Sequence, residues 1–127
     1  MNITHFSQQR LYATFRQWDV PMDFADPMAN YLMYGLEPGS CFTAVLANDF
    51  GAAILSSHPN NSVEAFKTLV GWMRSHVPPR AYGSYERVRA WIDLGSDERR
   101  AILEHNRLIY TAKEETWLAL KGEEVMA

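Results

Sequence analysis

Apolar residues dominate residues 26–55, a stretch that contains no lysine or arginine. Within it, Asp26 can cap a helix over residues 27–34, because aspartate favours the N-cap and proline the first helical position. Gly35 can end this helix in a left-handed conformation. A second apolar helix is predicted over residues 40–47. Two consecutive apolar helices predict a buried centre that more amphipathic helices cover.

The pattern before and after these two helices predicts shorter elements. Phe6, Leu11, Phe15 and Trp18 lie mostly on one face of a helix that ends near Trp18. After residue 47, Asn48 and Asp49 mark a break or a new cap before the apolar residues 52–55.

The clearest amphipathic pattern follows, capped by Asn61 or Ser62, with Glu64 in the capping-box position after Asn61. Its apolar positions recur at steps of three and four and form one seam: Val63, Phe66, Val70, Met73 and Val77. The prolines at 78 and 79 end this helix. The pattern predicts a helix with one buried face.

Three further helices are predicted from their caps, at Ser84, Ser96 and Thr111. The apolar side of the first comprises Tyr85, Val88, Trp91 and Ile92. In the second, Ile102 and Leu103 point inward, whereas Arg99 and Arg100 stay in water. The third has a capping box formed by Thr111 and Glu114 and ends at Gly122. Its expected anchors in the core are Trp117, Leu118 and Leu120.

No period-two strand pattern competes with these helices. The sequence therefore predicts an all-α fold, a compact bundle of about six or seven short helices around the buried apolar pair. Residues 1–122 are expected to form a single helical domain, because 127 residues is a common domain size. Residues 123–127 are expected to be a frayed tail.

Composition narrows the class of protein. Hydrophobic residues make up 47% and charged residues 21%, which is typical of a globular chain and not of a disordered one. The single cysteine, Cys41, excludes an internal disulfide and favours a reducing compartment. The N-terminus lacks a signal-peptide pattern, and no apolar run reaches membrane-spanning length. We therefore expect a soluble protein of the cytoplasm.

The net charge of −3 is unevenly distributed. Residues 1–63 hold two basic and five acidic side chains, residues 64–110 eight and six, and residues 111–127 two and four. A weakly positive middle between acidic ends differs from the basic stripe of a duplex DNA binder.

Candidate catalytic residues are few. Cys41 at a helix N-terminus could have a lowered pKa and act as a nucleophile, but its apolar neighbours favour a buried, inert thiol. Asp23, Asp26 and Asp49 could form an acid–base group if the apolar helices fold back on each other. The four histidines lack the spacing of a helical zinc site: His5, His58, His76 and His105. No metal or cofactor is predicted.

Arginines alternate with aromatic residues between Arg80 and Trp91, a mixture that single-stranded nucleic acid binders use. An amphipathic helix with buried aromatics explains most of the same spacing. A protein interface is the third reading, because arginine and tyrosine are enriched at binding hot spots. The residues predicted to bind a partner are Arg74, Arg80, Tyr82, Arg87 and Arg89.

Residues 23–40 (DFADPMANYLMYGLEPGS), 42–50 (FTAVLANDF), 57–59 (SHP) and 110–111 (YT) resemble a group of small accessory proteins encoded by bacteriophages and prophages. The resemblance covers nearly the whole chain. It implies a protein that binds and blocks a host component, with defence nucleases such as CRISPR complexes as one example.

We therefore expect a non-enzymatic inhibitor whose partner is a host or phage protein complex in the host cytoplasm. A nucleic-acid-binding accessory factor is the first alternative. A small hydrolase that uses Cys41 or the aspartates is the second. A homodimer is a further expectation, because 47% apolar residues and four tryptophans leave apolar surface to cover.

Overall fold

The computed structural model describes residues 5–56 and 62–126, with side chains as far as residue 122, and the described part contains eight α-helices and no strand. The all-α prediction is confirmed, with slightly more helices than expected. The α-helices are α1 (His5–Gln17), α2 (Ala25–Tyr34), α3 (Ser40–Leu46), α4 (Phe50–Ser56), α5 (Val63–His76), α6 (Tyr85–Asp93), α7 (Ser96–His105) and α8 (Ala112–Met126). Two short 3-10 helices are η1 (Met22–Phe24) and η2 (Pro79–Ala81).

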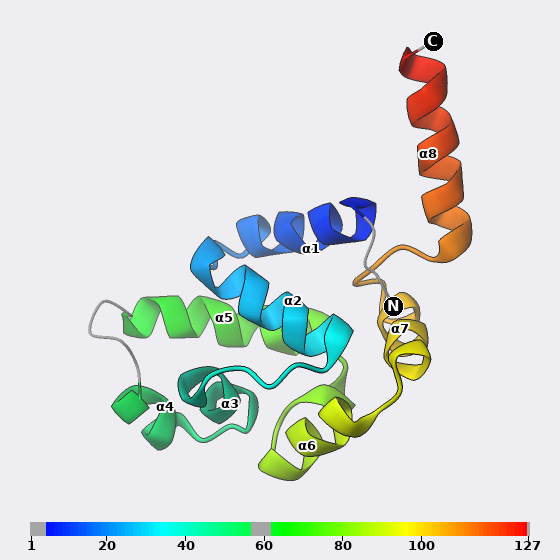
Figure 1. Cartoon of the computed structure of the whole chain (residues 1–127). Helices are drawn as coiled ribbons and strands as arrows, with labels where there is room; N and C mark the ends of the chain where they lie inside the picture. The colour runs from blue at the N-terminus through cyan, green and yellow to red at the C-terminus, as the bar shows by residue number, and fades with distance from the viewer. Residues whose placement is uncertain (1–4, 57–61, 127) are drawn as a thin grey trace.

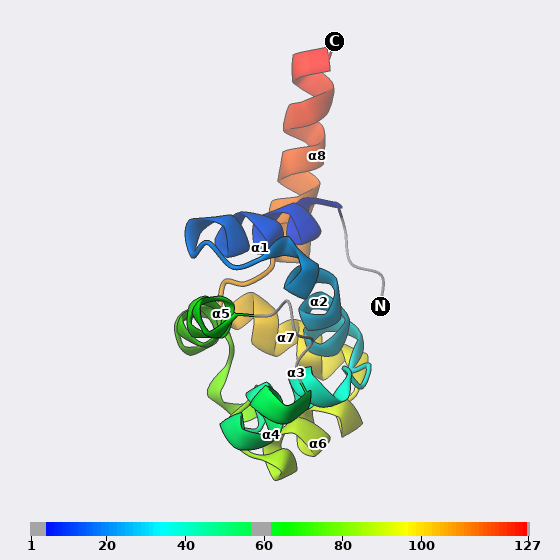
Figure 2. The same cartoon turned by 90° about the vertical axis from the view of Figure 1, so that its left-hand side faces the viewer.

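The helices form a layered body from which one helix projects. α1 lies on one side of α2 and α5, and α3, α4 and α6 lie on the other side (Figures 1 and 2). α7 packs against α2 at one end of the body. α8 points away from all of these helices.

The centre of the body is α2, as the apolar pattern predicts. Six of its residues are buried: Ala25, Met28, Ala29, Tyr31, Leu32 and Met33. The second half of α3 is also buried, which confirms the expected central pair. The hydroxyl of Tyr31 donates to the carbonyl of Ala81 at 2.6 Å, and the indole N–H of Trp91 donates to the carbonyls of Tyr31 and Leu32. These bonds satisfy the polar atoms of buried aromatics and join α2 to α6 and η2.

At the two ends of α2, one sequence prediction is confirmed and one is wrong. Gly35 follows the helix with φ 64° and ψ 28°, the predicted left-handed cap. Asp26 is not the N-cap, because α2 starts at Ala25 directly after η1. Its carboxylate instead accepts a hydrogen bond from the hydroxyl of Tyr12 at 2.5 Å, which joins α1 to α2. A tertiary partner has replaced the local one.

The predicted side-chain caps of α5, α6 and α8 are present. Ser62 and Ser84 each accept a hydrogen bond from the backbone N–H three residues later, both at 3.1 Å. Thr111 and Glu114 form the reciprocal capping box, with bonds of 2.7 and 3.2 Å. Ser96 is wrong as a cap, because it is the first residue of α7 and Gly95 occupies the cap position.

The buried face of α5 differs from the predicted seam. Leu69, Trp72 and Met73 are buried, and the ring of Trp72 stacks on Phe15 with centroids 4.4 Å apart. Val63 was expected in the core but is 63% exposed. The first turn of α5 therefore extends beyond the core. In the rest of the predicted seam, Met73 and Val77 are buried and Phe66 and Val70 are partly buried against the core, so the buried face includes this part of the seam and is widened by Leu69 and Trp72.

Arg99 contradicts the prediction that it stays in water, since only 6% of it is exposed. Its Nε donates to the carbonyl of Met33 at 3.4 Å, and its Nη1 donates to the carbonyls of Ile92 and Leu94. These carbonyls belong to the ends of α2 and α6, where helical acceptors lack partners. Arg99 thus joins the C-terminal ends of two helices to the first turn of α7.

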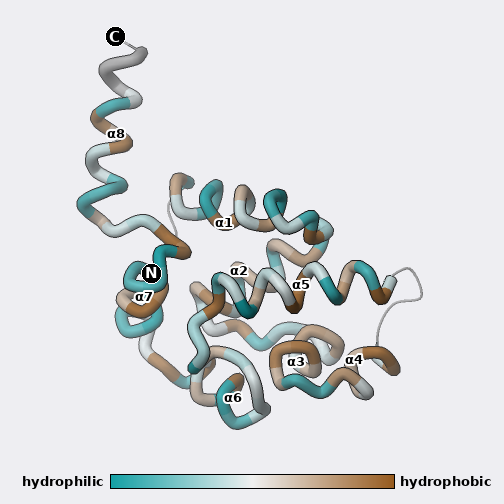
Figure 3. The backbone as a smooth tube through the Cα atoms, turned by 180° about the vertical axis from the view of Figure 1, so that it is seen from behind, coloured by the Kyte–Doolittle hydropathy of each residue, from teal (hydrophilic) through white to brown (hydrophobic). Residues whose placement is uncertain are grey.

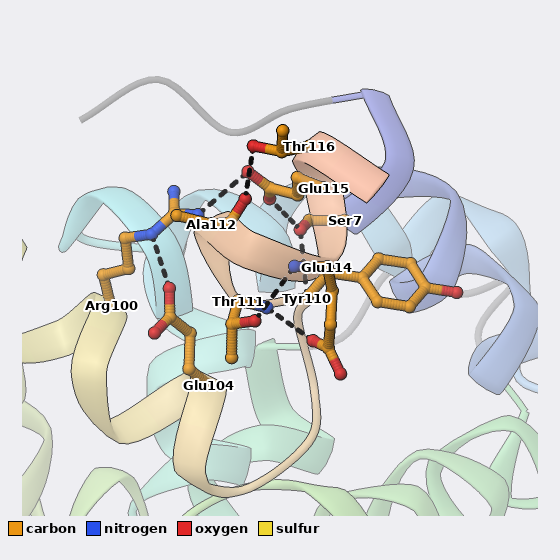
Figure 4. A network of polar contacts seen from close by, with 9 residues as sticks. All are labelled: Ser7, Arg100, Glu104, Tyr110, Thr111, Ala112, Glu114, Glu115 and Thr116. Atoms are coloured by element: carbon orange, nitrogen blue, oxygen red, sulfur yellow. Dashed lines mark hydrogen bonds and ion pairs between the residues drawn. The ribbon is translucent and has the colours of Figure 1, made fainter. Parts of the chain in front are cut away.

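The predicted apolar anchors of α8 are also wrong. Trp117 is 59% and Leu120 56% exposed, and α8 continues beyond Gly122 to Met126. Polar contacts hold its first turns, as Figure 4 shows: Glu115 accepts from Ser7 at 2.7 Å and from Arg100 at 3.0 Å. α8 is therefore fixed at its base while Trp117 and Leu120 face solvent, and Leu118, the third predicted anchor, is half-buried.

Candidate partner-binding surface

Four of the five predicted partner-binding residues gather around η2. Arg74 comes from the last turn of α5, Arg80 from η2, Tyr82 from the loop and Arg87 from α6. We call these four residues the η2 arginine surface. Arg74, Tyr82 and Arg87 line one groove of about 710 Å³, and Arg80 and Arg87 line the neighbouring hollow. Arg87 thus belongs to both depressions.

The local sequence explains how the chain forms this surface. Val77 and the following prolines end α5, and Pro79 starts η2 because its fixed φ suits a first helical position. Gly83 then adopts φ 114°, a conformation that other residues rarely adopt. Its N–H donates to the carbonyl of Leu46 at 2.7 Å, which fixes the loop against α3. The segment between α5 and α6, which carries Arg80 and Tyr82, is therefore held by defined backbone contacts.

The arginines of the surface form no ion pair within the described part of the chain, although Glu86 lines the hollow that Arg80 and Arg87 share. No carboxylate in the described residues lies within ion-pair distance of the three guanidinium groups. The Nη1 of Arg87 donates to the carbonyls of Pro79 and Tyr82 at 3.1 and 3.3 Å, which orients its guanidinium. The surface presents positive charge to solvent.

Arg89, the fifth predicted residue, lies apart from the other four. It sits two residues after Arg87, which places it on another side of α6. Its guanidinium is 4.0 Å from the carboxylate of Glu37, and both side chains are exposed. The structure therefore does not bring Arg89 into the η2 arginine surface.

The aromatic residues between 80 and 91 do not form a common face. Trp91 is buried under α2, and its N–H is bonded to backbone carbonyls. Tyr85 was expected on the apolar side of the helix but is exposed. Its hydroxyl donates a hydrogen bond to the carboxylate of Asp49 at 2.7 Å. That bond raises the pKa of Tyr85. Tyr82 is half-buried. Successive bases could not stack on these three rings together.

The candidate catalytic residues have separate structural contacts. The thiol of Cys41 donates to the carbonyl of Ala53 at 3.5 Å, and burial raises its pKa, the direction opposite to nucleophilic activation. Asp26 bonds Tyr12, whereas Asp49 bonds Tyr85 and accepts from the first turn of α4 at 3.3 Å. Asp23 is exposed on η1.

No group of three or more histidine, cysteine, aspartate or glutamate residues in the described ranges is placed to hold a metal ion. His5, His76 and His105 lie on α1, α5 and α7, and His58 lies outside the described residues.

An apolar groove adjoins the arginine surface, and the sequence pattern did not indicate it. Val45, Phe50 and Val70 line both depressions, and the apolar one continues to Ile54, Val63 and Phe66. We call it the α4–α5 groove. At the end of the apolar stretch, Ile54 is 62% exposed and Leu55 is more exposed still. A seven-residue helix with apolar residues around its circumference cannot bury all of them. This pattern in residues 50–56 was the sequence feature that could have indicated the groove.

Comparison with known proteins gives no assignment. No protein-family model matches the chain, and neither a curated protein nor a solved structure matches it. In the described part, no helix combines the length and apolar character needed to cross a membrane. Functional inference therefore rests on the geometry of the surface and on the resemblance noted in the sequence.

Proposed function

We propose that this chain is a non-enzymatic binding protein that places its η2 arginine surface on an acidic site of a host macromolecule and blocks that site. The observation that carries the proposal is the gathering of Arg74, Arg80 and Arg87 without a carboxylate partner in the described residues. Guanidinium groups bind carboxylates through paired hydrogen bonds, and arginine and tyrosine are common hot-spot residues. Arg87 is already oriented by backbone carbonyls, which lowers the entropy lost on binding.

The blocking role is supported by the resemblance to small phage accessory proteins. Such a protein acts stoichiometrically in the host cytoplasm, and a CRISPR-like complex is one example of a target. A surface of a few arginines and a tyrosine suits occlusion, because it needs a complementary acidic patch and no reacting groups.

A protein partner fits better than a nucleic acid. The chain carries a net charge of −3, and three arginines can neutralise few phosphates. Trp91 is buried and Tyr85 is bonded to Asp49, so the aromatic platform of single-strand binders is missing from this segment. Nucleic acid binding is the second candidate, because the same arginines would also accept phosphate groups.

The test is affinity capture from bacterial host lysate with the immobilised chain, followed by mass spectrometry. We compare the wild type with the double variant Arg74→Glu/Arg80→Glu and with the matched control Arg89→Glu. Arg89 has the same chemistry but lies outside the η2 arginine surface. We expect a protein that the wild type and the control retain and the double variant loses.

Nuclease treatment of the lysate separates the two candidates. Retention that survives nuclease supports a protein partner. Retention that nuclease abolishes, together with steeply salt-dependent binding to single-stranded oligonucleotides, supports the nucleic acid candidate instead. Equal retention by the double variant and the wild type contradicts the assignment of the surface.

A further inference from the structure

The α4–α5 groove is an apolar surface that nothing in the described part of the chain covers. It encloses about 340 Å³, and its walls include Phe50, Ile54, Val63 and Phe66. Among the described residues, Lys67 is the only charged one that lines it. Figure 3 shows the hydrophobic colour reaching the edge of the body at α4. Exposed apolar patches rimmed by polar residues mark binding sites.

The arm formed by α8 is the second uncovered apolar surface. None of its side chains from residue 112 to residue 122 is buried. Trp117 and Leu120 are three residues apart, so they lie on one face of the helix. An exposed tryptophan and leucine on one helical face match the anchors that amphipathic helices insert into apolar grooves.

The arm cannot reach the groove of its own chain. α8 and α4 lie at opposite ends of the molecule in both views (Figures 1 and 2). The base of the arm is also fixed, because Glu115 is bonded to Ser7 and to Arg100. The occupant of the groove therefore comes from outside the chain.

We propose that α8 of a second copy occupies the α4–α5 groove, and that two copies exchange their arms reciprocally. Reciprocal exchange closes the assembly as a two-fold dimer and covers both apolar surfaces of each copy. The sizes are compatible, since the α5 side of the groove runs from Val63 to Val70, about 11 Å at 1.5 Å per residue, and Trp117 and Leu120 span about 5 Å of the arm.

Charge complementarity favours the arm as the occupant. The sequence places Glu123 and Glu124 about one turn beyond Leu120. Glu114 and Glu115 pair within the chain, so the free part of the arm, residues 116–127, carries one basic and two acidic side chains. The basic one, Lys121, lies over the ring of Trp117 at 5.1 Å. The groove offers the opposite sign in Lys67. With Trp117 and Leu120 among the apolar walls, an acidic end next to a lysine-lined groove adds a favourable interaction.

The experiment is sedimentation velocity with the full chain over a range of concentrations. We expect a monomer–dimer equilibrium for the wild type. Leu120→Lys is expected to raise the dimer dissociation constant at least about 30-fold, as for a hot-spot residue. Leu36→Lys is the matched control, because Leu36 is equally exposed but belongs to neither surface, and its dissociation constant should equal that of the wild type.

A complementation experiment identifies the pair of surfaces. Leu120→Lys damages the arm, and Ile54→Lys damages the groove. Each variant alone should be monomeric at concentrations where the wild type is dimeric. A mixture should form a heterodimer through the one intact arm and the one intact groove. Both positions are exposed, so circular dichroism and urea midpoints should match the wild type.

Charge reversal tests the electrostatic part. Lys67→Glu should weaken the dimer, and combining it with Glu123→Lys/Glu124→Lys in the same chain should restore it. A monomeric wild type at millimolar concentration overturns the proposal. An unchanged dimer in Leu120→Lys also overturns the proposal. A mixture that fails to form the heterodimer overturns it as well, and would indicate that the arms pair with each other.

This inference does not depend on the proposed function. Arg80→Glu removes charge from the η2 arginine surface and leaves both apolar surfaces intact, so its dimer dissociation constant should equal that of the wild type. Conversely, Leu120→Lys should keep the captured partner. Failure of either proposal is therefore distinguishable from failure of the other.

Discussion

The guanidinium of Arg99 gives the most specific stability prediction, tested by Arg99→Met. Methionine retains an unbranched side chain but leaves the carbonyls of Met33, Ile92 and Leu94 without their donor. Two of these bonds are long, at 3.4 and 3.5 Å, and count as weak. An unpaired buried acceptor costs about 1 to 3 kcal/mol, and removing a buried charge returns part of the loss. We expect the free energy of unfolding to fall by about 2 to 3 kcal/mol.

The assay is urea unfolding followed by circular dichroism, with thermal unfolding as a second measure. A loss of this size lowers the melting temperature of a chain this long by about 10 °C. Arg89→Met is the matched control, because its ion pair to Glu37 is exposed and its loss should cost about 1 kcal/mol or less. The reasoning is refuted if Arg99→Met is as stable as Arg89→Met.

Gly35 provides an independent check of the same contact. A Cβ added to Gly35 would lie 2.7 Å from the Nη1 of Arg99, and the backbone there has φ 64°. Gly35→Ala should therefore destabilise through both a steric clash and backbone strain. In the Arg99→Met background the strain and a tight contact with the carbonyl oxygen of Ile92 at 3.2 Å should remain, so the alanine should cost less there. Equal costs in both backgrounds would show that the two residues do not touch.

The remaining predictions concern other elements. Burial lowers the pKa of His76 below its usual 6.5, and the Nε2 of His76 accepts a hydrogen bond from the indole N–H of Trp18 at 3.1 Å. Neutral His76 therefore contributes stability above pH 6.5, and this contribution is lost as the pH falls below that value. Urea midpoints should decrease from pH 7.5 to 5.5, and they should decrease less in His76→Gln. Cys41 should react with iodoacetamide at pH 8 more slowly in the folded than in the unfolded chain, measured by mass spectrometry. Ser84→Ala should lower the free energy of urea unfolding by about 1 kcal/mol through loss of a cap. Trp117→Ala should change that of the monomer by less than about 0.5 kcal/mol, because the ring is exposed.

Features set by neighbouring residues were predictable from the sequence. Gly35, Ser84 and the Thr111–Glu114 capping box act within four residues of their own helix ends, and each is present. The burial of α2 also followed from the sequence, because a mostly apolar segment of ten residues favours a helix inside the core, whereas the seven-residue α4 remains at its edge.

Features set by distant partners were not predictable. Arg99 reads as a solvated residue in the pattern of α7, and its carbonyl partner Met33 is 66 residues away in the sequence. Asp26 is of a residue type that commonly caps helices, but its carboxylate accepts a hydrogen bond from Tyr12 on another helix. Trp117 has the chemistry of a core residue, yet α8 leaves the body.

The candidate site shows the same division. The segment rich in arginine and tyrosine was visible in the sequence, and the two-residue spacing of Arg87 and Arg89 already placed them on different sides of a helix. Which of the two sides faces η2 required the orientation of α6. Arg74 lies more than ten residues before Arg87, and only the turn through η2 places both in one groove. Which arginines lack a carboxylate partner depends on the whole fold.

The central claim is that the chain works by binding through the η2 arginine surface. Its most direct measurement is an NMR titration of the labelled chain with the captured partner, following the backbone amides. The account predicts that the largest shifts occur around Arg74, Arg80 and Tyr82, and that Arg89 responds weakly. Shifts confined to α1 and α7, with the amides around η2 unchanged, would contradict it.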